Sequence, residues 1–235
     1  MPEVEALYAL LLDRLGPQGW WPAETAEEMI VGAVLTQAVA WHNACRAIME
    51  LRRAGLLRLD ALAVCDASQL APLVRSAGYF NVKARKLVAL ARHITAVGGV
   101  PALAALPAAE ARAELLGVYG VGPETADAIV CYALGKPVMV ADAYARRVLG
   151  RVGILPQAQQ ASYASARQWL MQALDGRGDA AWFGEFHALL VAVGKHWCRP
   201  TEPRCVECPA LRICAQGCRA EWEKQGDGPD RHGAS

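Results

Sequence analysis

The chain has 235 residues, of which 54% are apolar and 20% are charged. That much apolar material fills one large or two small cores, which excludes an intrinsically disordered protein. No apolar run approaches the roughly 20 residues that a membrane span requires, and the first residues lack a basic cluster ahead of their apolar part. We therefore expect a soluble cytoplasmic protein with no targeting signal. The net charge of +1 neither requires nor excludes a polyanionic partner.

Apolar residues at helical spacing run along almost the whole chain. The clearest stripes are Ala26, Met29, Ile30, Ala33 and Val34, and later Leu87, Leu90, Ala91 and Ile94. Capping residues predict helix starts at Thr25, Ser68, Asn81 and Asp142. Glycine and proline predict breaks at 16–22, 78–80, 98–101 and 117–123. Since no stretch alternates with a period of two for long enough to build a sheet, the predicted fold is all-α.

Four cysteines are crowded near the C-terminal end. Cys198, Cys205, Cys208 and Cys214 follow the pattern Cys-x6-Cys-x2-Cys-x5-Cys. In a reducing compartment such crowding favours a metal site over disulfides. Four thiolates suit either a tetrahedral zinc ion or a [4Fe–4S] cluster, but zinc sites usually contain two closely spaced cysteine pairs and only one occurs here. We expect Cys218, outside this pattern, not to be a ligand.

A glycine-rich turn lies between two helical patterns. Gly120 and Gly122 precede Pro123, which is a favourable first residue of a helix. The two glycines let backbone N–H groups turn outward at a helix N-terminus, where they bind a phosphate oxygen. Any tight turn between helices has a similar sequence, so the motif is weak by itself. Its spacing to Asp142 strengthens it.

Asp142 has two compatible interpretations. It precedes the helical stretch from Ala143 to Val148, so it is a plausible N-cap. A carboxylate held at a helix start is also oriented and kept ionised, which suits it to stabilise a developing sugar cation.

Together these features resemble the endonuclease III family of helix-hairpin-helix DNA glycosylases. The resemblance covers residues 24–214 and includes Val34–Gln37, the 78–84 turn, the hairpin, Asp142 and the 6-2-5 cysteine spacing, which is that of the family's [4Fe–4S] loop. It implies a six-helix barrel domain at 24–134 and a second helical domain, formed by 1–23 and 135–218, that carries the cluster. DNA is expected across the cleft between them, and residues 219–235 are expected to form a flexible tail.

The resemblance implies base excision from double-stranded DNA by a monomer that acts in the cytoplasm with the chromosome. The damaged nucleotide is flipped out and its N-glycosidic bond is cut. Gln37 would fill the gap in the stack, and Tyr79 or Phe80 would be the wedge on the opposite strand. The remaining DNA-binding residues expected are Gly120, Gly122, Thr125 and Lys195.

Glu124 departs from the bifunctional members, which carry a lysine at that position. Glutamate cannot form the Schiff base, and no other lysine lies between Lys86 and Lys136. The enzyme is therefore predicted to be monofunctional, with water as the nucleophile and Asp142 assisting it. Glu124 is the second catalytic carboxylate to consider, or simply a solvated first-turn glutamate.

The substrate predicted for this chain is an alkylated purine such as 3-methyladenine, because the hairpin region is similar to the 3-methyladenine branch of the family. Ala38 and Val39 replace a polar pair of that branch. Trp20, Trp21 and Trp41 would form the base pocket, since tryptophan is the best platform for a flat cation, or would serve only in packing. The alternatives are a glycosylase for oxidised or mismatched pyrimidines with weak lyase activity, and an inactive DNA-damage-binding homologue.

Overall fold

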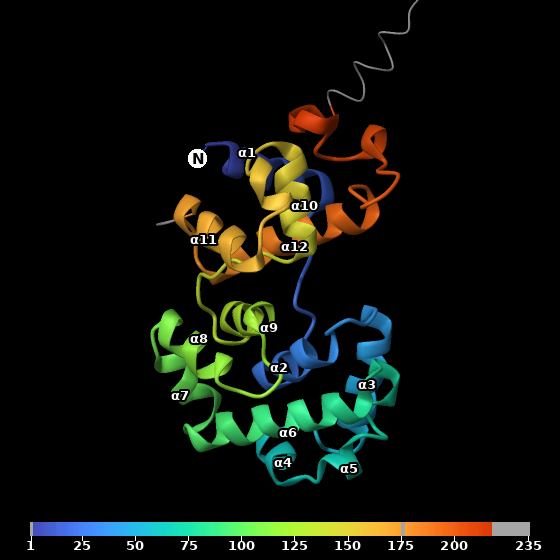
Figure 1. Ribbon diagram of the computed structural model, residues 1–235, viewed down its shortest axis with the longest axis vertical. Coiled ribbons are helices and arrows are strands. Elements are labelled where there is room, and N and C mark those ends of the chain that lie inside the picture. Colours follow the sequence, from blue (N-terminus) through green and yellow to red (C-terminus); the bar gives the residue numbers. More distant parts are fainter. Residues whose placement is uncertain (1, 175–176, 218–235) are drawn as a thin grey trace, which may run out of the picture. The chain divides into compact units, whose positions relative to one another are not determined.

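The computed structural model describes residues 2–174 and 177–217, and these contain helices and no strands (Figure 1). The prediction of an all-α fold is confirmed. The flexible tail expected at 219–235 and the role expected for Cys218 lie outside the described residues. Among the described helices, none alone is long and apolar enough to cross a membrane, and the one pair that would suffice together, Phe80–Ala96 with Gly99–Ala105, is bent by 70°.

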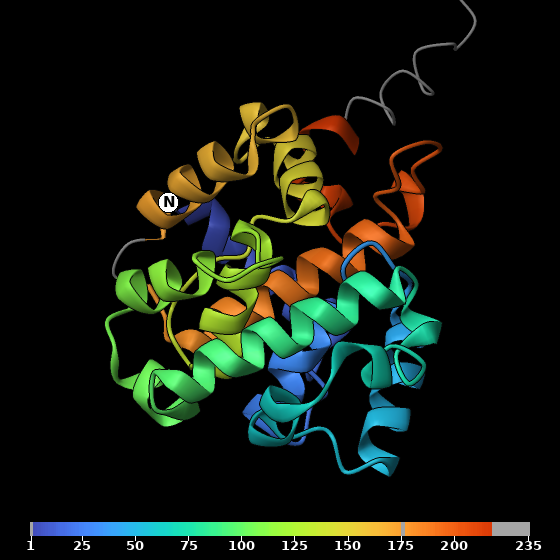
Figure 2. The ribbon, with the colours of Figure 1, turned by 60° about the horizontal axis from the view of Figure 1, so that its bottom comes forward.

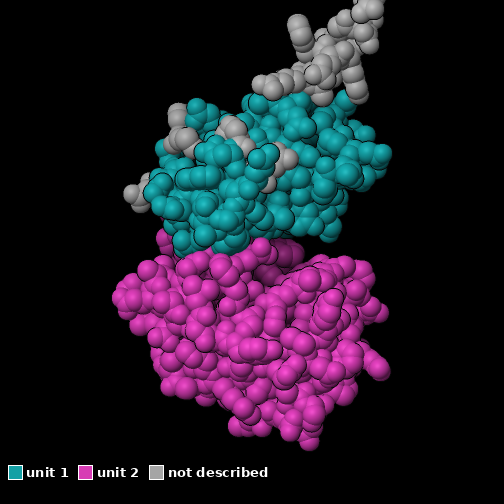
Figure 3. Space-filling view, in the orientation of Figure 1, with its two compact units in different colours: residues 1–18, 141–177, 185–235 teal, residues 19–140, 178–184 magenta. Residues whose placement is uncertain are grey.

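The chain divides into two compact units, which Figure 3 shows in different colours. Unit 1 is Met1–Gln18, Ala141–Arg177 and Glu185–Ser235, and unit 2 is Gly19–Val140 and Gly178–Gly184. The boundaries differ from the expected domains, because residues 19–23, 135–140 and 178–184 pack with unit 2. The assignment of 24–134 to a barrel and of the remainder to a cluster domain stays a prediction.

Unit 2 is built around the helix α2. Its helices are α2 (Ala26–Leu35), α3 (Trp41–Arg53), α4 (Leu59–Val64), α5 (Ala67–Leu70), α6 (Phe80–Ala96), α7 (Gly99–Ala105), α8 (Ala108–Leu116) and α9 (Pro123–Ala128), with a 3-10 turn at Arg75–Ala77 and a π-helical turn at Ile129–Ala133. Every residue of α2 from Glu28 onward is buried, so this helix is apolar nearly all round. The long helix α6 packs against α2, α4 and α5 (Figures 1 and 2). Its buried positions include the predicted stripe Leu87, Leu90, Ala91 and Ile94.

Two of the four predicted helix starts are correct. The Thr25 side chain accepts the N–H of Glu28, and the Asp142 side chain accepts the N–H of Ala145. The start predicted at Ser68 is wrong, because the cap of α5 is Asp66, whose carboxylate accepts the Ser68 N–H. The start predicted at Asn81 is also wrong: α6 begins at Phe80, and no side chain caps it.

The helical hairpin is formed by α8, the turn at 117–122 and α9. A buried ion pair joins its two helices, since Arg112 Nε lies 2.8 Å from Asp127 Oδ1 and the Asp127 side chain is fully buried. Val118 and Val121 are buried and anchor the turn from inside, while Tyr119 is exposed. Pro123 occupies the first turn of α9, as predicted. The turn is therefore presented on a rigid base.

Unit 1 contains α1 (Pro2–Leu15), α10 (Ala143–Val152), α11 (Tyr163–Ala173) and most of α12 (Ala180–His196). Short 3-10 turns follow at Pro156–Gln159, Cys205–Glu207 and Leu211–Ile213. Its core gathers fully buried apolar side chains from these helices: Val4, Leu7, Leu11, Leu149, Leu170, Phe186, Leu189, Leu190 and Val193. This packing fixes the start of α10, where Asp142 lies, and the end of α12, where the cysteine segment begins.

Candidate nucleic-acid interface and active site

Asp142 is a buried carboxylate at the start of α10. Its Oδ1 accepts the backbone N–H of Ala145 at 2.7 Å, so the residue is the N-cap of the helix. Its Oδ2 lies 3.6 Å from Nε2 of His187, a buried residue of α12. The residue as a whole is only 8% exposed. One carboxylate oxygen is therefore held by the cap of α10, and the other faces a buried histidine of α12 at more than hydrogen-bond distance.

Gln37 lies just after α2, and its side-chain amide is held by three hydrogen bonds. Its Nε2 donates to the Gly120 carbonyl at 3.1 Å and to Thr125 Oγ1 at 2.9 Å. Its Oε1 accepts from Lys86 Nζ at 2.6 Å. The structure thus brings together Gln37, the hairpin turn and Thr125, three of the expected DNA-binding elements. Lys86 was not predicted as a member of this group.

The two aromatic candidates for the wedge differ in their surroundings. Tyr79 has a left-handed backbone conformation, with φ of 44°, and is 77% exposed. Phe80, the first residue of α6, is only partly exposed, and the guanidinium of Arg75 lies 5.5 Å from its ring centroid. A side chain that enters a base stack must be free to leave the protein surface. Tyr79 is therefore the better candidate.

The two glycines of the turn differ in whether the local structure requires a glycine at that position. Gly120 has φ of +82°, and a Cβ there would lie 2.3 Å from Cγ of Lys86. Both its backbone conformation and the passing lysine side chain therefore require glycine. Gly122 has an ordinary extended conformation with open space around it. Because Gly122 has no side chain, it offers no side-chain cap to the start of α9.

Glu124 lies in the first turn of α9 and is exposed, in unit 2. Asp142 belongs to unit 1. The two candidate catalytic carboxylates are thus contributed by different units.

The three tryptophans of the predicted base pocket form one aromatic cluster. The ring centroid of Trp20 lies 4.9 Å from that of Trp21 and 4.7 Å from that of Trp41, and Trp21 lies 5.5 Å from Trp41. All three side chains are partly exposed. Trp20 and Trp21, together with Tyr132, also line an open cavity of about 410 Å³ in unit 2. The cluster has the flat, partly accessible aromatic surface that stacking on a base requires.

The four cysteines of the 6-2-5 pattern line one small cavity in unit 1, together with Arg151 and Trp197. The pKa of Cys208 is raised to about 11, chiefly by burial and also by the neighbouring Cys198, Cys214 and Cys205. The backbone N–H of Gly217 donates to Cys214 Sγ at 3.3 Å. Within residues 2–174 and 177–217, however, no three His, Cys, Asp or Glu side chains are grouped so that they hold a metal ion as they stand.

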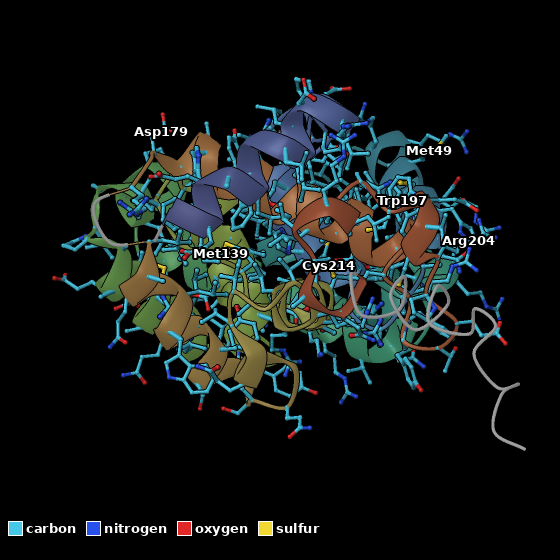
Figure 4. The ribbon with its side chains drawn as sticks, turned by 90° about the horizontal axis from the view of Figure 1, so that it is seen from above. Met49, Met139, Asp179, Trp197, Arg204 and Cys214 are labelled. Carbon is cyan, nitrogen blue, oxygen red and sulfur yellow. The ribbon has the colours of Figure 1, made fainter. Side chains whose placement is uncertain are left out.

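Two arginines of α10 support the cysteine segment. Arg147 donates to the carbonyls of Cys198 and Gly194, and Arg151 donates to those of Arg199 and Pro200. A third, Arg146, donates to the Ala161 carbonyl. All three guanidinium groups therefore fasten backbone within unit 1. The segment also folds back on itself where the Arg204 N–H donates to the Trp197 carbonyl at 2.9 Å (Figure 4).

Lys195, expected to bind DNA, is exposed in the last turn of α12. It borders a shallow pocket with Tyr144, Arg147 and Arg199. Its position leaves the ammonium group accessible to a phosphate.

An all-α chain with a glycine-turned helical hairpin and a buried N-capping aspartate has the features of a helix-hairpin-helix DNA glycosylase. The HhH-GPD superfamily of base excision DNA repair proteins matches residues 31–171. A protein of Methanocaldococcus jannaschii named as a DNA repair glycosylase is 37% identical over 211 residues, which are 88% of this chain and 94% of that protein. Endonuclease III of Bacillus subtilis is 30% identical over 67% of this chain and 66% of its own length.

Solved structures give the same result. The Helicobacter pylori 3-methyladenine DNA glycosylase bound to 1,N6-ethenoadenine is 28% identical, with a TM-score of 0.65 over 83% of this chain and 96% of that one. A non-covalent endonuclease III–DNA complex shares the fold at 20% identity, with a TM-score of 0.74 over 94% of this chain and 98% of that one. The chain belongs to the HhH-GPD superfamily and is a DNA repair glycosylase of the endonuclease III type.

Proposed function

We propose that this glycosylase excises alkylated purines such as 3-methyladenine from double-stranded DNA and hydrolyses the N-glycosidic bond without cleaving the strand. The observation that carries this proposal is the cluster of Trp20, Trp21 and Trp41. A purine alkylated at a ring nitrogen is a flat cation, and indole rings bind such cations by stacking and by cation–π attraction. The 28% identity to a protein named a 3-methyladenine glycosylase supports the same substrate class.

Asp142 is the catalytic carboxylate in this proposal. An alkylated base is already a good leaving group, so the enzyme needs to stabilise positive charge on the sugar and to orient a water molecule. The buried carboxylate of Asp142, with one oxygen held by the cap of α10, meets both needs. The water attacks the anomeric carbon and its proton passes to Asp142 or to solvent, while the bond to the base breaks and its electron pair leaves with the base.

In this proposal, Glu124 is the reason why the enzyme has no lyase activity. A lyase forms an imine between an amine and the sugar, and a carboxylate has no nitrogen for that bond. In addition, Lys86, the lysine that contacts the hairpin, is engaged with Gln37. Glu124 instead adds negative potential at the first turn of α9.

The DNA-binding surface in this proposal consists of Gln37, Tyr79, the hairpin N–H groups and Lys195. Gln37 fills the space left by the flipped nucleotide and Tyr79 enters from the other strand. The exposed position of Tyr79 supports its role, and the glycine-turned start of α9, which no side chain caps, supports phosphate binding. The proposal also includes that the protein is a monomer and acts in the cytoplasm with the chromosome.

A [4Fe–4S] cluster in the cysteine cavity is also part of the proposal. The donor set fits, because four cysteines line the cavity and the guanidinium of Arg151 and the N–H of Gly217 point at sulfur atoms, which stabilises thiolates. Cys198, Cys205, Cys208 and Cys214 would hold the cluster. When bound, it supplies a redox-active centre and four covalent anchors for the segment.

The experiment that tests the substrate is base release from duplexes that each carry one lesion, scored before and after alkali. Release of 3-methyladenine or 1,N6-ethenoadenine, with strand breaks appearing only after alkali, is expected. Release confined to oxidised or mismatched pyrimidines would overturn the substrate assignment. Specific binding without release of any base would identify the protein as a damage-binding homologue.

A further inference from the structure

Lys83 is a lysine in the core of unit 2. It lies in the first turn of α6, and only 2% of it is exposed. Its Nζ donates to the Leu35 carbonyl at 2.8 Å and to the Ala77 carbonyl at 2.7 Å. A buried ammonium is costly unless its donors are satisfied, and these two carbonyls accept two of its three N–H donors. Through these two hydrogen bonds the Lys83 side chain joins two segments that are far apart in the sequence.

The first segment is the end of α2, which leads into Gln37. The last carbonyls of a helix lack partners within the helix. Here Thr36 satisfies Gly32 and Ala33, the Gln37 N–H satisfies Val34, and Lys83 satisfies Leu35. The ammonium also sits at the negative end of the helix dipole. Lys83 therefore fixes where α2 stops and where the Gln37 turn begins.

The second segment is the Gly78–Tyr79 turn. Its entry is held by the Ala77 carbonyl, which accepts from Lys83 Nζ, and its exit by the Tyr79 carbonyl, which accepts the backbone N–H of Lys83 at 2.9 Å. The Lys83 side chain thus holds the entry of the turn that presents Tyr79, while the exit bond is the ordinary first hydrogen bond of α6. The turn in which Tyr79 has its left-handed conformation is therefore tied to the core by this ammonium group.

Lys86, one helical turn further along α6, has a separate task. It holds the Gln37 side chain, whereas Lys83 holds the Gln37 backbone turn. Lys83 is thus the only one of the two whose Nζ contacts, in the described residues, bridge the Gln37 segment and the Tyr79 segment.

We propose that Lys83 is a positioning residue for base flipping, which holds the Gln37 turn and the Tyr79 turn at a fixed separation so that both enter the duplex together. The proposal rests on the proposed roles of Gln37 and Tyr79 in DNA. It explains why a lysine rather than an apolar residue occupies a core position. Burial lowers the pKa of Lys83 to about 8, with the charge of Lys86 as a second cause, so the ammonium is retained at neutral pH against its desolvation.

The test compares Lys83→Met with wild type on two substrates in single-turnover assays. In one substrate the alkylated base lies in a fully paired duplex. In the other it lies opposite an abasic site, where flipping the base out costs little free energy because no base pair is broken. Lys83→Met should release the base at least about tenfold more slowly from the paired duplex and within about twofold of wild type from the duplex with the abasic site. Equal loss on both substrates, or no loss on either, would overturn the proposal, since a purely structural role does not distinguish them.

The matched control is Lys136→Met, which removes another lysine–carbonyl hydrogen bond, from Nζ to Ala104 at 2.8 Å, away from both turns. It should behave as wild type on both substrates. If Lys83→Met does not fold, Lys83→Gln keeps N–H donors on a side chain one bond shorter and should show the same pattern, because it cannot reach both carbonyls.

A second measurement does not depend on the substrate class. A duplex with 2-aminopurine opposite a tetrahydrofuran abasic analogue reports insertion of protein side chains by a fluorescence change at saturating protein. The change should fall to about a third or less of the wild-type value in Lys83→Met. If wild type releases no alkylated base, the proposed substrate fails, and this measurement alone decides the role of Lys83. A wild-type fluorescence change in Lys83→Met would then refute it.

Discussion

Oδ2 of Asp142 lies 3.6 Å from Nε2 of His187, while Oδ1 of the same carboxylate accepts the Ala145 N–H at 2.7 Å. A helix cap requires only one carboxylate oxygen. The second oxygen faces a buried histidine of another helix and takes no part in capping α10. An ionised carboxylate with one oxygen outside the cap has the electrostatic character that stabilisation of a positive charge requires.

Asp142→Asn is expected to abolish most turnover and to leave folding intact. Loss of one electrostatic stabiliser of a transition state costs about 10²–10³ in rate, whereas asparagine caps a helix about as well as aspartate. Single-turnover base release and thermal unfolding measure the two effects separately. Asp66→Asn, which alters the exposed cap of α5, is the matched control and should change neither. Release within about threefold of wild type would reduce Asp142 to a cap.

Glu124 is expected to prevent a covalent intermediate with DNA. Borohydride should trap no protein–DNA adduct with wild type, because a carboxylate forms no imine. Glu124→Gln should also trap none, while Glu124→Lys should give a detectable adduct if the amine reaches the sugar. Denaturing electrophoresis of radiolabelled DNA measures the adduct. Efficient trapping by the wild-type enzyme would contradict the monofunctional assignment.

The cysteine cavity is expected to contain about four irons per chain and to give broad absorbance near about 400 nm in protein purified without chelator. Cys205→Ser should lower the iron content and the thermal stability of unit 1, because a covalent anchor of the segment is lost. Cys65→Ser, at a cysteine remote in sequence from the cluster, should change neither. Metal analysis and absorbance spectra measure this. One zinc ion per colourless chain would contradict the cluster.

The stability of the protein is expected to depend on pH through Lys83. Its pKa is lowered from 10.5 to about 8 in the folded protein. Between these values the unfolded chain binds a proton that the folded chain does not, so the free energy of unfolding rises with pH. The full cost of the buried charge is present below pH 8 and is relieved towards pH 10.5. Between pH 7 and 10, wild type should therefore gain about 2 kcal/mol relative to Lys83→Met.

Urea titrations of both proteins at several pH values measure this difference. Comparing the two proteins at each pH cancels the other titrating groups. A difference that stays constant from pH 7 to 10 would show that Lys83 is not a charged buried group.

The sequence by itself determined the features that depend on local spacing. Periodic apolar residues identified the buried faces of α2 and α6. The residue types at Thr25 and Asp142 identified the caps of α2 and α10, and the hairpin, Asp142 and the cysteines identified the family. Only the tertiary structure decided which backbone groups meet which side chains. Lys83 lies on the same face of α6 as Leu87, Leu90 and Ile94, but its burial and the two carbonyls that accept from it were found only in the structure.

The arginines of α10 and the wedge residue show the same limit. The sequence does not assign partners to Arg147 and Arg151, and the fold brought the carbonyls of the cysteine segment to them. The sequence did not distinguish Tyr79 from Phe80 as the wedge. In the structure the guanidinium of Arg75 lies over the Phe80 ring. Periodicity indicates which face of a helix is buried, because the apolar residues that define that face all lie within the helix. It does not report the partners of a polar side chain, because those partners come from segments that only the folded chain brings together.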